Sequence, residues 1–515
     1  MNRTQKSLKN ITAAAIGQSF GLIISFVARI FFVQILGKEY LGLNGLFSNI
    51  LTILSLAELG VGEAITFSLY KPLAKHDTDK CRALMQLYKK VYTIIGVVIF
   101  VLGLAVSPFL NYLIKDVPDI PNIQLIFILF VLNTSISYFF SYKRNLIIAD
   151  QNRYIATIYR YGFFFVLNVA QIICLATTKN YILFLSLQII TTLLENIAIS
   201  LKANQLYPYL KNKESESLDK RDKNEIIKNT KAMLMHKVGG IIVSSTDNLL
   251  LSKFVNLASV GLYSNYYLIT NAINLVFNQV FSSITASVGN LCVGKDYEKQ
   301  YKTYKKVDFL NYWITSFATI CLICLFSPLI TIWLGNEYTF NFLTTLIIVI
   351  NFYVYGMRKT NLTFREASGL FYKDRWKAVI EAEINLVASI ILAIHFGVFG
   401  VFLGTFISSI TTCVWVEPYI LYKYQFKKKL RSYFGTYIKR AALTTIIATA
   451  MYYLCSFVNS GDQYIDFSAK LIACLAIPNF VMWLIFRKAN EFRYFKDLIA
   501  KIIKSAKRKI AKKSR

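Results

Sequence analysis

The sequence predicts an all-α polytopic membrane protein with 14 transmembrane helices: two six-helix lobes related by a pseudo-two-fold axis along the membrane normal, plus two C-terminal helices. Three observations predict this class: an apolar surplus, apolar segments of membrane-spanning length, and basic residues confined to alternate loops. Apolar residues make up 55% of the 515 residues and charged residues only 17%. Soluble chains carry charge at about a quarter of their positions, so we expect the surplus to face lipid.

A bilayer core of roughly 30 Å requires about 20 apolar residues per helix. This criterion places spans near residues 10–36, 41–70, 91–114, 122–141, 154–176, 181–201, 232–254, 258–288, 308–333, 341–357, 377–396, 398–420, 441–459 and 468–486. The first span is too long for the core of a cleavable signal peptide, so we expect it to be retained.

The longest polar interval, residues 202–231, mixes charges of both signs without an apolar run, which is typical of a solvated linker. We therefore expect five regions along the chain. They are an N-lobe at 1–201, the linker at 202–231, a C-lobe at 232–420, helices 13 and 14 at 421–486, and a basic amphipathic cytoplasmic tail at 487–515.

The basic residues predict the orientation, because Lys and Arg are retained on the cytoplasmic side. Of the 58 Lys and Arg residues, 51 lie in the alternate segments that begin with the N-terminus, and the outer loops hold only Lys38, Lys115 and Lys179. We expect a multi-pass protein of the cell inner membrane with both termini cytoplasmic. The loops and the tail account for the net charge of +30, so no nucleic-acid partner is expected, and the tail is predicted to lie on anionic inner-leaflet lipids.

Two hairpins repeat across the linker. The segment RIFFVQILGKEYLGLNGLFSNIL resembles DNLLLSKFVNLASVGLYSNYYLIT, and Gly42 corresponds to Gly261 with a period of 219 residues. Arg29 then falls one position out of step with Asp247. Because six helices intervene, both copies start from the same side, so the repeat is parallel and predicts two lobes around a central cavity.

Charged residues deep in the predicted spans are the candidate site residues, since each costs at least about 2.5 to 3.5 kcal/mol unless it finds partners or water. Arg29 and Asp247 are predicted to bind substrate, Arg29 because a guanidinium suits bidentate contact with a diphosphate. They are also predicted to pair when the outer side is closed, and the alternative for Arg29 is a purely structural ion pair. Glu58, Glu63 and Glu195 are candidate cation-coupling or cavity residues.

Two glycines separate Glu58 from Glu63, and a helix broken there would let both carboxylates face one cavity. No cofactor or metal is expected, but the buried carboxylates allow coupling to protons or sodium. Four further charges lie near the predicted cytoplasmic boundary, where snorkelling or local pairing is the expected outcome: Arg160, Glu381, Glu383 and Glu417.

These features resemble the polysaccharide-transporter branch of the multidrug/oligosaccharidyl-lipid/polysaccharide superfamily, the Wzx-type oligosaccharide flippases. The resemblance rests on Arg29 before ILGKEYLGLNG, the AELGVGEAI segment, Asp247 before SVGLYSNYY, and the plan of 14 spans. It implies alternating access that carries undecaprenyl-diphosphate-linked oligosaccharide repeat units from the inner to the outer leaflet. The partners would be the lipid-linked oligosaccharide and other polysaccharide assembly proteins.

Three other functions remain open. A cation-coupled multidrug exporter of the same superfamily often carries an acidic residue in its first helix, where this chain has Arg29. A lipid II flippase tends to concentrate arginines in its first two helices, whereas the second helix here carries acids. A membrane glycan polymerase or ligase usually presents catalytic groups on large external loops, and these outer loops are short. We therefore expect a transporter rather than an enzyme.

Overall fold

The computed structural model describes residues 3–58, 61–211, 245–294, 296–370 and 376–497, together with isolated positions between 218 and 230 and residue 373. They belong to two compact units: residues 1–264 with 393–398, here called the first unit, and residues 265–392 with 399–515, the second unit. Helices are the only regular elements in these ranges, which confirms the predicted all-α class. The predicted lobe boundaries at 201 and 232 remain predictions.

Helical elements follow one another closely along the chain, and η marks short 3₁₀ or π turns. The first unit contains α1 (Arg3–Leu54), η1 (Ser55–Glu58), α2 (Val61–Lys75), α3 (Thr78–Val106), η2 (Ser107–Phe109), α4 (Leu110–Leu113), α5 (Ile123–Ala149), α6 (Arg153–Thr178), α7 (Tyr181–Leu206), η3 (Pro208–Lys211) and η4 (Leu251–Val255). From α9 (Leu257–Val293) the chain enters the second unit, which contains α10 (Tyr297–Leu334), η5 (Asn336–Tyr338), α11 (Phe342–Met357), α12 (Lys359–Ala367), α13 (Lys377–Thr411), α14 (Cys413–Ile420), η7 (Leu421–Phe426), α15 (Arg431–Ser456) and α16 (Gln463–Phe486).

Every predicted span coincides with helix in the described part of the chain, although the seventh is described only from residue 245. Eight of the described helical segments are long and apolar enough to cross a membrane. Two of these segments each continue from one predicted span into the next through a single glycine, Gly37 in α1 and Gly397 in α13. Their φ angles of 84° and 56° lie in the left-handed region that favours glycine, so one residue makes each sharp turn.

The outward-facing side of α6 is apolar, as expected for a helix in contact with lipid. Val166 and Ile173 are each 57% exposed, whereas Asn168 and Gln171 on the same helix are 8% and 7% exposed. This arrangement is the reverse of a water-soluble helix, which turns its polar side outward. The protein interior therefore holds the polar groups of this helix, as expected for residues that line a cavity in a membrane.

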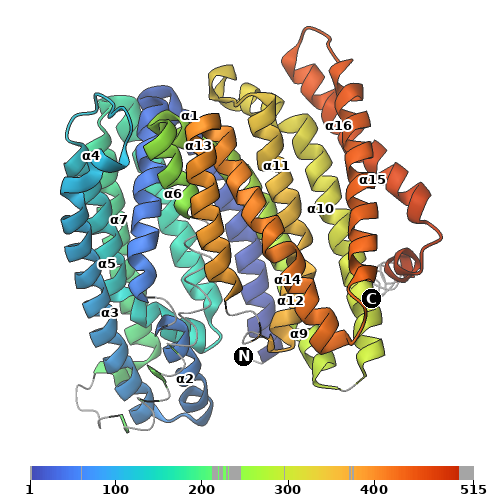
Figure 1. Ribbon diagram of the computed structural model, residues 1–515. Helices are drawn as coiled ribbons and strands as arrows, with labels where there is room; N and C mark the ends of the chain where they lie inside the picture. Colours follow the sequence, from blue (N-terminus) through green and yellow to red (C-terminus); the bar gives the residue numbers. More distant parts are fainter. Residues whose placement is uncertain are drawn as a thin grey trace, which may run out of the picture. The chain divides into compact units, whose positions relative to one another are not determined.

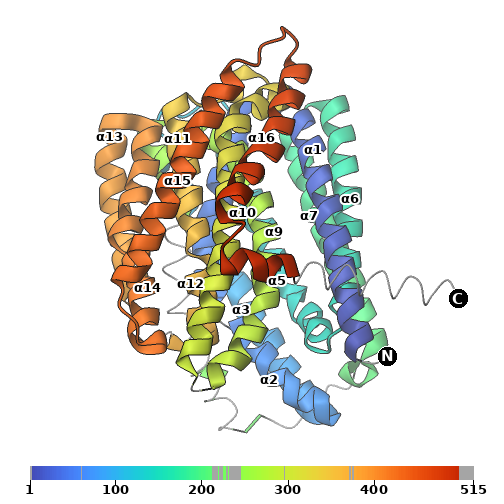
Figure 2. The same cartoon turned by 90° about the vertical axis from the view of Figure 1, so that its right-hand side faces the viewer.

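Each helix packs against several others within its unit. In the first unit, α5 lies between α3 and α7 (Figure 1), and α6 lies beside α1 and α7 (Figure 2). In the second unit, α10 packs against α11, α15 and α16. Residues 490–497 form a further short helix, which crosses α10 in dark red in Figure 2. The tail is thus helical as far as it is described; the expected lipid-facing residues from 498 onward lie outside the described ranges.

The start of the second span and the start of α9 touch backbone to backbone. A β-carbon on Gly42 would lie 2.2 Å from the carbonyl oxygen of Leu257, and one on Gly261 would lie 2.2 Å from the carbonyl oxygen of Lys38. Gly42 and Lys38 correspond to Gly261 and Leu257 through the repeat period of 219 residues, so the two contacts are equivalent under the repeat. Reciprocal contacts of this kind are the signature of residues beside a two-fold axis, here the predicted pseudo-two-fold. The repeat recognised in the sequence therefore has a direct structural counterpart in the first unit.

We expect Gly42→Ala and Gly261→Ala each to destabilise the protein by about 1 to 3 kcal/mol, because the added methyl group overlaps a backbone carbonyl that cannot rotate away. Thermal unfolding of the purified protein in detergent measures the effect. Gly162→Ala is the control, since its added methyl group meets nothing within 4 Å. Equal melting temperatures for all three variants would show that the glycine contact is dispensable.

Candidate functional site

Arg29 lines a polar pocket of about 290 Å³ within the first unit. Its Nη1 atom donates a hydrogen bond of 2.8 Å to the Ser264 hydroxyl. The pocket is otherwise lined by apolar side chains and by five more polar ones: Ser25, Asn44, Asn168, Gln171 and Gln188. A guanidinium surrounded by amide groups in a helix bundle offers hydrogen-bond donors for an anion and both donors and acceptors for hydroxyl groups.

The sequence alone did not predict that several amide side chains line this pocket. Asn168 and Gln171 use their amide nitrogens on the backbone, donating to the carbonyl oxygens of Phe164 and Phe184 at 2.7 and 3.1 Å. Such bonds fix the side-chain orientation, so the pocket is built on rigid helices. One feature of the sequence could have indicated these residues. Asn168 and Gln171 lie three positions apart within an apolar span, which places both on one face of a helix.

The internal repeat also relates the contact between Arg29 and Ser264 to a second pair of neighbouring residues. Arg29 corresponds to Asn248 and Gly45 corresponds to Ser264, and the Asn248 amide nitrogen lies 4.0 Å from the β-carbon position of Gly45. The Asn248 side-chain oxygen is buried without a hydrogen-bond partner in the described part of the chain. The exact repeat partner of Arg29 is therefore a neutral amide, next to Asp247.

Asp247 is buried, with 8% of its surface exposed, in the helical segment formed by residues 245–250. This agrees with the expectation that it lies inside the protein rather than facing lipid. Its predicted pairing with Arg29 stays a prediction.

Glu58 is held by two tyrosines. It ends η1, and its carboxylate oxygens accept hydrogen bonds from the hydroxyls of Tyr92 at 3.0 Å and Tyr138 at 2.9 Å. A β-carbon on Gly62 would lie 2.4 Å from the Tyr92 hydroxyl oxygen, so a larger residue there would displace the Tyr92 side chain. The α-helix ends at Leu54, Glu58 lies in the turn η1, and α2 begins at Val61. The Glu63 side chain lies outside the described part.

Glu195 forms an ion pair with Arg144 on α5, with an Nη2 to Oε1 distance of 2.5 Å. The same guanidinium nitrogen donates to the Asn196 side chain at 3.2 Å. The next residue of α5, Asn145, approaches the Tyr92 hydroxyl at 3.5 Å. The polar contacts of Glu58 and of Glu195 therefore reach two neighbouring residues of α5, Asn145 and Arg144, inside the first unit.

The sequence matches a known protein family. Residues 7–286 match the model of a family described as polysaccharide biosynthesis protein, which is more than half of the chain. The chain belongs to this family. No curated protein matches the sequence of the chain.

Solved structures show that this member of the polysaccharide biosynthesis family shares its fold with transporters of the MOP superfamily. It is 14% identical to the lipid II flippase MurJ in an inward closed conformation, over 92% of this chain and 98% of that one, with a TM-score of 0.63. It is 15% identical to an inward-facing multidrug resistance transporter of the MATE family, over 80% and 98% of the two chains, with a TM-score of 0.62. A MOP superfamily transporter from Pyrococcus furiosus matches at 14% identity and a TM-score of 0.52, over 82% and 96% of the two chains.

These findings confirm the predicted family branch and the predicted fold. Each of the three solved structures is by its own description a flippase or a transporter. At such low identity the likeness establishes the fold of this chain and not its cargo.

The second unit of the family member contains a buried cluster of charges of both signs. Glu417 is fully buried and accepts from Arg358 Nη2 at 2.8 Å and from Lys377 Nζ at 2.5 Å. Arg358 also lies 3.6 Å from Glu381. Local pairing rather than snorkelling is therefore the outcome for Glu381 and Glu417, while Glu383 is exposed. The cluster joins α13, α14 and the turn between α11 and α12, so we interpret it as structural.

We expect Glu417→Gln to destabilise the protein by about 3 to 5 kcal/mol, because it leaves the buried cations Arg358 and Lys377 with one carboxylate between them. Glu383→Gln makes the same change at an exposed position of α13 and should leave the melting temperature unchanged. Unfolding curves of the two variants in detergent test this assignment. A Glu417→Gln protein as stable as the control would mean that the cluster does not hold the helices together.

Proposed function

We propose that this protein is a flippase that translocates undecaprenyl-diphosphate-linked oligosaccharide repeat units, of a capsular or other surface polysaccharide, from the inner to the outer leaflet of the cytoplasmic membrane by alternating access. The observation that carries the proposal is the position of Arg29, in a pocket lined by amide side chains inside a member of the polysaccharide biosynthesis family.

The chemistry of the pocket suits the proposed cargo. A diphosphate is a compact anion, and a guanidinium binds such groups through two parallel charge-assisted hydrogen bonds. Amide side chains both donate and accept hydrogen bonds, which is what sugar hydroxyls require. A cationic drug would instead be repelled by Arg29, so the pocket favours the glycan carrier over the multidrug exporter of the same superfamily.

The proposed setting follows the charge distribution of the loops. Both termini lie in the cytoplasm, the basic tail rests on anionic lipids of the inner leaflet, and other polysaccharide assembly proteins supply and consume the cargo. Transport against a gradient requires an energy source. We propose that Glu58 takes part in coupling to protons or sodium, because a carboxylate inside a membrane protein changes its charge when it binds either cation.

Deletion of the gene tests the proposed cargo. The lipid-linked repeat unit should accumulate, and it should be inaccessible to a membrane-impermeant glycosidase until the inner membrane is opened. Complementation with the wild-type gene should remove the accumulated material. The proposal fails if no lipid-linked glycan accumulates and sensitivity to cationic drugs rises instead, which is the result expected of a multidrug exporter.

Substitutions at Arg29 should reduce export of the glycan in a graded order. A charge-assisted hydrogen bond contributes about 1.5 to 3 kcal/mol, so Arg29→Gln should lower the export rate by roughly 10-fold to 100-fold. Arg29→Lys keeps the charge but loses the bidentate geometry and should show a smaller loss. Pulse-labelled surface polysaccharide measures the rate at matched protein levels.

Arg153→Gln is the control for this series, because it removes an arginine from an exposed position at the start of α6. Its export rate should equal that of the wild type. Normal export by a stably expressed Arg29→Gln protein would remove Arg29 from the cargo site.

Glu58→Gln should uncouple export from the ion gradient. Glutamine keeps the size of the side chain and can accept from one tyrosine hydroxyl with its oxygen and donate to the other with its amide nitrogen, but it cannot take up or release a proton or balance the charge of a sodium ion. Vesicles carrying the wild-type protein should therefore transport faster when a proton or sodium gradient is imposed, whereas vesicles with the variant should not. A variant that responds to both gradients as strongly as the wild type would contradict a coupling role.

A further inference from the structure

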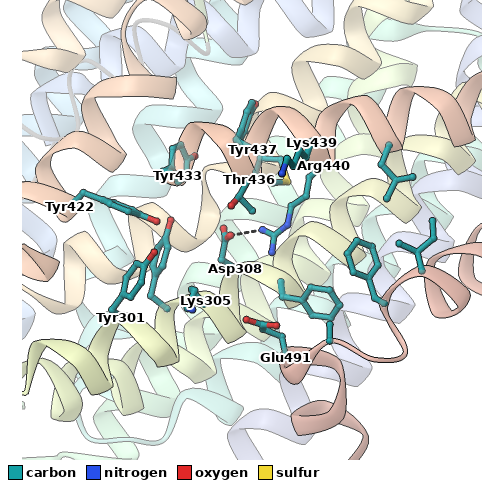
Figure 3. Close-up of a pocket in the computed structure, with 17 residues that line it drawn as sticks. Tyr301, Lys305, Asp308, Tyr422, Tyr433, Thr436, Tyr437, Lys439, Arg440 and Glu491 are labelled. Atoms are coloured by element: carbon teal, nitrogen blue, oxygen red, sulfur yellow. Dashed lines mark hydrogen bonds and ion pairs between the residues drawn. The ribbon is translucent and has the colours of Figure 1, made fainter. Parts of the chain in front are cut away.

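A cavity of about 450 Å³ opens in the second unit where α10, η7 and α15 meet the segment that follows α16. Figure 3 shows its lining, with tyrosine rings on one side and a group of charged side chains at the centre. The aromatic residues of the wall are Tyr301, Tyr304, Phe309, Tyr422, Tyr433, Tyr437 and Phe486. The charged residues are Lys305, Asp308, Lys439, Arg440 and Glu491. None of these residues belongs to the Arg29 pocket or to the buried Glu417 cluster.

The cavity lies at a predicted membrane boundary. The ninth predicted span begins at residue 308, the thirteenth at residue 441, and the fourteenth ends at residue 486, and all three positions line the cavity or adjoin a lining residue. Tyrosines concentrate at this depth, where one end of the ring contacts hydrocarbon and the hydroxyl reaches the headgroups. The cavity is therefore at the level of the phospholipid headgroups.

The short helix 490–497 packs against α10 beside the cavity. Phe492 stacks on Trp313 of α10 with 5.6 Å between ring centroids, and the Lys306 ammonium lies 3.8 Å from the centroid of the Tyr494 ring. This helix crosses α10 rather than continuing α16 (Figure 2). Its first turn supplies Glu491 to the cavity, so the interfacial helix closes one side of the site.

Several charged groups of the cavity have unused binding capacity. Arg440 Nη1 contacts Asp308 Oδ2 at 2.5 Å, while its Nε and Nη2 atoms make no hydrogen bond to the part of the chain that the structure describes. The Lys305 ammonium lies 5.3 Å from the centroid of the Tyr301 ring and forms no ion pair with any residue in the described ranges. Lys439 and Glu491 form no ion pair with any described residue, so cations and one carboxylate are available to a ligand.

We propose that this cavity binds the headgroup of a zwitterionic aminophospholipid of the phosphatidylethanolamine type. Its phosphate is bound by the remaining donors of Arg440 together with Lys305 and Lys439, as a charge-assisted contact. Its ammonium is bound by Glu491 and by the faces of the tyrosine rings, which attract cations. The acyl chains leave over the apolar residues Phe309, Leu443 and Ile485.

The Glu491 carboxylate, which forms no ion pair with any described residue, favours an aminophospholipid headgroup over an anionic one. An anionic lipid such as phosphatidylglycerol would gain the same contacts with its phosphate but would bring no cation to Glu491. The headgroup of an aminophospholipid carries one charge of each sign and matches a site that presents both. A bound lipid would then connect α10, α15 and the helix 490–497 through one molecule.

Lipid binding to the purified full-length protein tests the proposal. Delipidated protein in detergent is titrated with phosphatidylethanolamine or phosphatidylglycerol of identical acyl chains, and the bound lipid is counted by native mass spectrometry. The wild type should bind phosphatidylethanolamine at least 10-fold more tightly than phosphatidylglycerol. The double variant Lys305→Gln and Lys439→Gln should lose at least 10-fold in affinity for both lipids.

Two further variants distinguish binding in the cavity from general attraction of lipids to a basic surface. Lys299→Gln with Lys302→Gln makes the same charge change on exposed positions of α10 outside the cavity and should bind both lipids as the wild type does. Glu491→Gln should abolish the preference for phosphatidylethanolamine while retaining phosphatidylglycerol. The proposal is overturned if the wild type binds phosphatidylglycerol equally well, if it binds neither lipid, or if the exposed pair of substitutions weakens binding as much as the cavity pair.

Discussion

The backbone contact between Gly42 and Gly261 is the constraint on which the first unit depends. Two helices that approach until a carbonyl oxygen lies where a β-carbon would be can do so only with glycine at both positions. Since the contact is reciprocal under the 219-residue period, it fixes the register of the second span against α9. Ser264, three residues after Gly261 in α9, accepts a hydrogen bond from Arg29 of the first span, so the same part of α9 contributes to the candidate site.

A second constraint is that charge inside a membrane protein must be compensated. The structure meets it in different ways at different places: tyrosine hydroxyls at Glu58, an arginine at Glu195, and two cations at Glu417. The Glu417 cluster is saturated and closed, which suits a structural role. The Arg29 pocket presents guanidinium and amide groups to a cavity of about 290 Å³, which suits the polar, anionic cargo that we propose.

Much of the fold could be predicted from the sequence, because the length of a span and the basic residues of the loops are local properties of the chain. The turns at Gly37 and Gly397 also follow from local glycines. Partners distant in sequence could not be predicted in this way. Arg144 was expected in a loop because the apolar run ends before it, yet α5 continues to Ala149 and brings the guanidinium to Glu195. Likewise, nothing local distinguishes Tyr92 and Tyr138 among 33 tyrosines.

In the proposed function, Arg29 recognises the diphosphate of a lipid-linked glycan. The most direct measurement is the initial rate of transbilayer movement in proteoliposomes, comparing a labelled polyprenyl-diphosphate oligosaccharide with its monophosphate analogue. We expect the wild-type protein to move the diphosphate about 10-fold faster or more, and Arg29→Gln to remove this difference while the slower monophosphate rate persists. Equal rates for the two lipids in the wild type, or an unchanged preference in the variant, would contradict it.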